Sequence, residues 1–86
     1  MLSAHRGDPA AAELQDWAQE VANRVDPAVQ TEVLFEEDSN TFILRLAKDA
    51  RVLVFRLSAS QVYTDGREPE CEKTLIRKIK DLWNMI

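Results

Sequence analysis

The chain has 86 residues and a formal net charge of −4, from 15 acidic and 11 basic side chains. This length suits a single hydrophobic core and is too short for two ordinary domains. Hydrophobic residues make up 45% and charged residues 30%, a globular balance that argues against wholesale disorder. The two glycines and three prolines exclude collagen-like and proline-rich classes.

The first periodic segment of the chain predicts an amphipathic helix. Asp8 and Pro9 favour a helix start, as cap and first helical residue, and Pro27 ends the helix. Between them apolar residues recur at spacings of three and four: Leu14, Trp17, Ala18, Val21 and Val25. Residues 1–7 carry no such pattern, so we predict a flexible N-terminal segment over 1–7 and a single domain over 8–86.

Residues 29–57 change to the period of two that is typical of half-buried strands. Strands are predicted over 29–36, 41–48 and 51–57. Residues 37–40 form the polar turn of the first hairpin, and Asp49 and Ala50 form that of the second. Three antiparallel strands in sequence order make a meander.

The two hairpin turns predict the register of this meander independently of each other. The first hairpin places Phe35 opposite Phe42, and the second places Lys48 opposite Arg51. Both closures put the same side chains of the middle strand on the inner face, and a one-residue slip in either hairpin would destroy that agreement.

The rest of the chain predicts a second long helix. Ser58 and Gln61 fit the cap of one short helical turn, and Pro69 is predicted to open the last helix. Its apolar stripe contains Leu75, Ile76, Ile79, Leu82, Trp83 and Ile86. The predicted fold class is therefore α+β: a two-layer α-β-β-β-α sandwich, in which both helices cover one face of a three-stranded antiparallel meander.

Catalytic and metal-binding patterns are absent from the sequence. The only histidine, His5, lies in the segment predicted to be flexible, and the only cysteine, Cys71, is predicted to line the core. No phosphate-binding or nucleophile-elbow motif occurs, and one His and one Cys give no zinc-type spacing. We therefore expect no enzyme, cofactor or metal site; an enzyme would require a cleft that brings Tyr63, Asp65 and Cys71 together.

The outer face of the predicted sheet is the first candidate site. It carries Leu34, Ile43, Val52 and Val54, interleaved with Glu32, Glu36, Arg45 and Arg56. A contiguous apolar set ringed by charges is typical of an interface, although strand propensity alone also explains β-branched residues there. The leading interpretation is a non-catalytic protein-interaction or self-association domain that binds a protein partner or forms a homodimer. Its predicted contact residues are Leu34, Ile43, Val54, Arg45 and Arg56.

The last helix is the second candidate site, through four basic residues: Lys73, Arg77, Lys78 and Lys80. The element order resembles, in topology only, double-stranded RNA-binding domains, which bind through a basic last helix. Acidic side chains at 68, 70 and 72 and in the 37–40 turn depart from that family, and the chain is not assigned to it. Nucleic-acid binding is thus the alternative to a protein partner, and a basic stripe that merely solvates the helix remains open.

The predicted location is the cytoplasm. A lone cysteine fits a reducing compartment, and residues 1–8 lack the apolar run that a secretory signal would need, so we expect none. The longest apolar stretch, 52–55, is far below the roughly 20 residues that span a bilayer. We therefore expect no membrane association.

Overall fold

A computed structural model describes residues 8–64, 66 and 68–85. The helices and strands are α1 (Asp8–Val25), β1 (Gln30–Glu36), β2 (Thr41–Lys48), β3 (Arg51–Ser58), α2 (Ala59–Tyr63) and α3 (Glu68–Trp83). This confirms the predicted α+β class and element order. The segment predicted to be flexible, with His5, lies outside the described residues, as do Asp65 and Ile86.

The sheet has the predicted order β1-β2-β3, antiparallel throughout. Phe35 pairs with Phe42 and Lys48 with Arg51, so both predicted registers are confirmed. The hairpin turns contain Asn40 at a φ of 52° and Asp49 at a φ of 56°. Asn and Asp tolerate this left-handed region better than most residues, which suits both turns.

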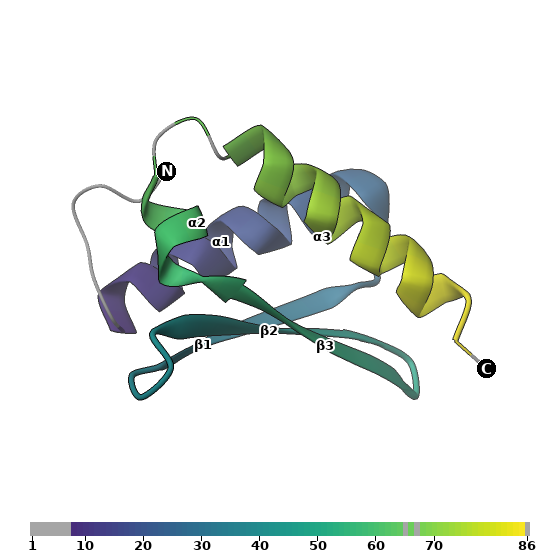
Figure 1. Cartoon of the computed structure of the whole chain (residues 1–86). Helices are drawn as coiled ribbons and strands as arrows, with labels where there is room; N and C mark the ends of the chain where they lie inside the picture. The colour runs from purple at the N-terminus through teal and green to yellow at the C-terminus, as the bar shows by residue number, and fades with distance from the viewer. Residues whose placement is uncertain (1–7, 65, 67, 86) are drawn as a thin grey trace.

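The helices α1 and α3 lie side by side on one face of the sheet, and no described helix covers the other face (Figure 1). The residues that lose all solvent contact come from every layer: Leu14, Val29, Phe42, Leu46, Val62, Leu75, Ile79 and Leu82. In addition, α1 buries four alanines, Ala10, Ala11, Ala18 and Ala22. Of these four, only Ala18 belongs to the apolar stripe predicted for this helix. Alanines contribute little to a hydrophobic pattern in the sequence, but their small side chains allow the helix to approach the sheet closely.

The short helix α2 is the capped turn that Ser58 and Gln61 predict. The Ser58 side chain accepts a hydrogen bond from the Gln61 backbone N–H, and the Gln61 side chain accepts one from the Ser58 N–H. Ala59 and Val62 are buried. The last helix begins at Glu68, one residue before the predicted start, because a proline within the first turn forfeits no intrahelical hydrogen bond.

A carboxylate after α1 joins three parts of the fold. Asp26 accepts hydrogen bonds from Lys48 Nζ at 2.6 Å, Trp83 Nε1 at 2.9 Å and the Ala28 N–H at 3.0 Å. It therefore links the end of α1 to β2 and to the last turn of α3. The indole reaches out to this carboxylate, so Trp83 remains 38% exposed although its position belongs to the predicted apolar stripe.

Loss of the Asp26 charge should reduce stability in a pH-dependent way. Hydrogen bonds from Lys48, Ala28 and Trp83 hold the pKa of Asp26 below its usual value of 3.8. The ionised carboxylate therefore adds to the free energy of unfolding above pH 3.8, and this stabilisation is lost as the pH falls through the lower pKa of the native state. In urea denaturation, Asp26→Asn should be less stable than the parent at pH 6, and the difference should shrink towards pH 3. The control is Asp38→Asn, at an exposed turn position; a stability loss in Asp26→Asn that does not vary with pH would contradict the expectation.

Candidate protein-association surface

The outer face of the sheet carries the predicted apolar set. Leu34 lies opposite Ile43, while Val54 and Val52 lie on β3. Leu34 is 57% exposed and Val54 is 56% exposed, whereas Ile43, in the middle strand, is half-buried by its neighbours. The register therefore brings the predicted apolar residues together, with the two side chains on the outer strands most accessible.

The charges on this face are only partly paired. Arg56 on β3 reaches across β2 to Glu36 on β1, with 3.8 Å between Nη1 and Oε1. Glu32 lies opposite Arg45 in the ladder, but the two side chains form no ion pair among the described residues. Both predicted arginines, Arg45 and Arg56, are exposed beside the apolar residues.

One edge of the sheet is closed by two glutamine side chains of α1. Gln19 accepts from the Thr31 N–H through Oε1 at 2.9 Å and donates from Nε2 to the Val29 carbonyl at 2.9 Å. Gln15 accepts from the Val33 N–H at 3.1 Å. These amides stand where a further strand would pair with β1, so they satisfy the outward backbone groups of this edge.

The opposite edge, at β3, has no such cover in its central part. Since the N–H groups of Thr31 and Val33 point away from β2, the alternation of an antiparallel ladder directs the N–H and C=O groups of Val52, Val54 and Arg56 outward from β3. None of these backbone groups has a hydrogen-bond partner among the described residues. From the sequence, Val52 and Val54 are expected on an edge strand that could pair with another chain, but the closure of the β1 edge was not predicted. The signal for that closure in the sequence is the spacing of four between Gln15 and Gln19.

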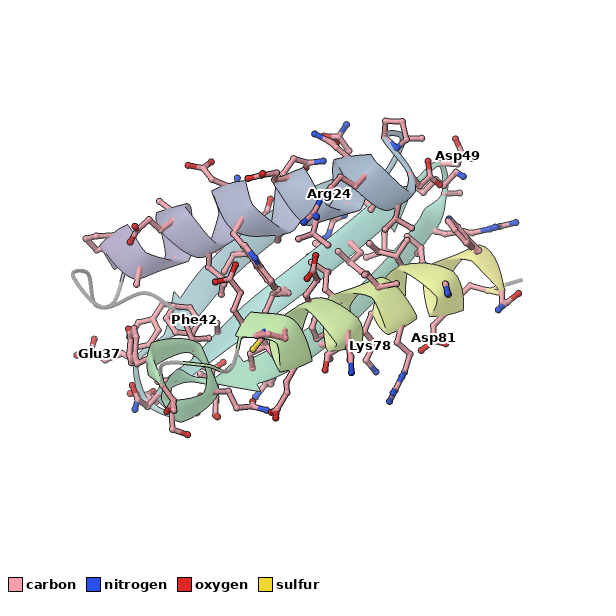
Figure 2. All side chains as sticks on the ribbon, turned by 90° about the horizontal axis from the view of Figure 1, so that it is seen from above. Arg24, Glu37, Phe42, Asp49, Lys78 and Asp81 are labelled. Atoms are coloured by element: carbon pink, nitrogen blue, oxygen red, sulfur yellow. The ribbon has the colours of Figure 1, made fainter. Side chains whose placement is uncertain are left out.

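The basic residues of α3 divide between two flanks of the helix. Lys73, Arg77 and Lys80 line an open hollow of about 410 Å³ together with Ile76. Lys78 points to the flank away from α1, where its Nζ lies 6.0 Å from the centroid of the Phe55 ring (Figure 2). Of the four predicted basic residues, Lys73, Arg77 and Lys80 thus share one face of α3, and Lys78 is not part of it.

Tyr63 and Cys71, two of the three residues that a catalytic cleft would require, are described, whereas Asp65 lies outside the described residues. Tyr63 packs edge-on against Phe42, at 5.8 Å between ring centroids, and Cys71 is buried in the core as predicted. No cluster of three metal-ligating side chains occurs among the described residues. Across the same residues, no helix combines the length and apolar character needed to traverse a membrane.

Comparisons of this chain with protein-family models, with curated proteins and with solved structures found no match.

Proposed function

We propose that the chain is a non-catalytic protein-association domain whose contact surface is the outer sheet face, engaged by a second copy or by another protein. The observation that carries the proposal is the set Leu34, Ile43 and Val54 on a sheet face that no described helix covers, where Leu34 lies opposite Ile43 and Val54 lies diagonal to it. Two packed sheets bury such faces against each other at a separation of about 10 Å. Arg45 and Arg56 supply the polar rim that interfaces of this kind carry.

A charge placed at the most exposed apolar position should weaken association. Leu34→Asp is preferable to a change at Ile43, because Ile43 is half-buried and its replacement would also reduce stability. In sedimentation equilibrium at two concentrations, we expect self-association of the parent chain and at least tenfold weaker association of Leu34→Asp. A cytoplasmic protein partner, if the parent is monomeric, should be released by the same substitution.

The matched control is Met85→Asp, which introduces the same charge at a position that is 37% exposed on the helix side of the fold. Met85→Asp should associate like the parent. A monomeric parent whose Leu34→Asp variant also keeps every protein contact would refute the proposal.

Nucleic-acid binding through α3 is a second candidate, favoured by one observation. Lys73, Arg77 and Lys80 line one hollow and form no ion pair with the described residues, so their charges are available to phosphates. The acidic side chains at the start of α3, Glu68 and Glu70, oppose the approach of phosphates. We therefore rank this candidate second.

Salt dependence tests the second candidate directly. Affinity for duplex or single-stranded nucleic acid should fall steeply with salt, and Arg77→Ala should reduce the slope of log K against log salt concentration by about 0.7–0.9. Lys78→Ala serves as the control, because Lys78 lies on the other flank of α3. Absence of binding at low salt would exclude this function.

A further inference from the structure

We infer that the open edge of β3 binds an extended peptide segment that alternates apolar and acidic residues and adds to the sheet as a fourth, antiparallel strand. The inference rests on the proposed function and deepens it, since it specifies a partner and a binding mode beside the outer sheet face. Strand addition draws affinity from main-chain hydrogen bonds and specificity from alternate side chains.

The two edges of the sheet differ in the feature that strand addition needs. At β1 the outward groups of Val29, Thr31 and Val33 are occupied by Gln15 and Gln19. At β3 the outward groups of Val52, Val54 and Arg56 remain available, and only the end of the strand is closed, where Gln61 accepts from the Ser58 N–H. An added strand could therefore form hydrogen-bonded pairs with about three residues of β3.

Side chains beside this edge determine the chemistry of the added strand. On the outer face the added residues would lie next to Val52 and Val54, which are 39% and 56% exposed, so apolar residues extend the existing patch. On the inner face they would lie opposite Leu53 and Phe55. Lys78 stands over Phe55, and Arg51 donates to the Trp83 carbonyl at 2.9 Å, so acidic residues on this side meet positive charge.

A second copy of the chain is a poor occupant of the same edge. The helix α3 lies above β3 (Figure 1), with Lys78 over Phe55. A second copy paired at this edge would bring its own Lys78 towards the same positively charged flank, whereas an extended segment with acidic residues meets opposite charge there.

The test uses the fluorescent peptide Thr-Val-Glu-Val-Glu-Val-Thr and the intact chain, with binding followed by fluorescence polarisation. With the central valine opposite Val54, the valines direct their N–H groups to β3 and the glutamates face Lys78 and Arg51. N-methylation of the central valine should therefore weaken binding at least tenfold, and N-methylation of either glutamate should have little effect. A peptide with lysines in place of the glutamates should bind at least tenfold more weakly.

Substitutions in the protein separate this inference from the proposed function. Val54→Pro removes one outward N–H at an edge position where proline is tolerated, and it should abolish peptide binding, while Val54→Thr keeps the N–H and should retain binding. Leu34→Asp, on the far strand of the outer face, should leave peptide binding intact.

The following results would overturn the inference. Absence of binding, or equal binding by both N-methylated peptides, would refute strand addition whether or not Val54→Pro folds. Loss of peptide binding in Leu34→Asp together with retention in Val54→Pro would assign the peptide to the sheet face, which refutes the inference and supports the proposed function. Self-association that Val54→Pro abolishes would show that β3 pairs with a second copy.

Discussion

Phe42→Ala is expected to remove about 3–5 kcal/mol from the free energy of unfolding. Phe42 is fully buried in the middle strand, where its ring lies 5.0 Å from that of Phe35 and 5.8 Å from that of Tyr63. Truncation therefore removes the free energy gained by burying the ring and also leaves a cavity between β1, β2 and α2. A domain of this size has a total stability of roughly 4–13 kcal/mol, so the variant should be largely or wholly unfolded at 37 °C.

Urea denaturation followed by circular dichroism measures this effect, and Leu34→Ala is the matched control. Both substitutions remove a large apolar side chain from a strand, but Leu34 is 57% exposed on the outer face. We expect Leu34→Ala to cost about 0.5 kcal/mol. Equal losses for the two variants would mean that the outer face is packed as tightly as the core, contrary to the observed layers.

Gln19→Ala is expected to cost about 2 kcal/mol, which is large for a side chain that is not fully buried. The Gln19 amide satisfies the Thr31 N–H, the Thr31 hydroxyl and the Val29 carbonyl at once. Removal of the amide leaves these part-buried backbone groups without a hydrogen bond, which lowers the free energy of unfolding by about 1–3 kcal/mol. The substitution also uncovers the β1 edge, so we expect aggregation to increase with concentration.

Hydrogen exchange of the Thr31 amide and urea denaturation test this prediction together. The control is Glu20→Ala, which removes the neighbouring polar side chain from the exposed side of the same helix. The Thr31 amide should exchange faster in Gln19→Ala and at the parental rate in Glu20→Ala. An unchanged rate in Gln19→Ala would show that the glutamine does not protect this edge.

The strand register was predictable because two hairpins share one strand. Phe42 and Leu44 are constrained from both sides, by the closure of each turn, and alternation leaves no second solution that buries them. The exposed positions Leu34 and Val54 follow from the same alternation. The composition of the candidate sheet face therefore follows from the amino-acid sequence.

The role of individual side chains beyond that face was not predictable. A glutamine such as Gln19, in the middle of a helix, has the same local pattern whether it solvates the helix or covers a strand edge. The contact to Thr31 depends on how α1 lies across the sheet, with Ala18 and Ala22 buried on the side that faces the core. Likewise, the sequence does not distinguish Lys78 from the three other basic residues of the last helix, and only its contact with the Phe55 ring separates it from them.

The sequence by itself determined the α+β class, the order of the elements, the two faces of the sheet and the burial of Cys71. These follow from local periodicity, which repeats within each element and requires no knowledge of its neighbours. Only the tertiary structure decided that the β1 edge is closed and the β3 edge open, that Asp26 joins three elements, and that the basic side chains of α3 face in two directions. Each of these depends on contacts between residues far apart in the chain, which arise only after the layers have packed.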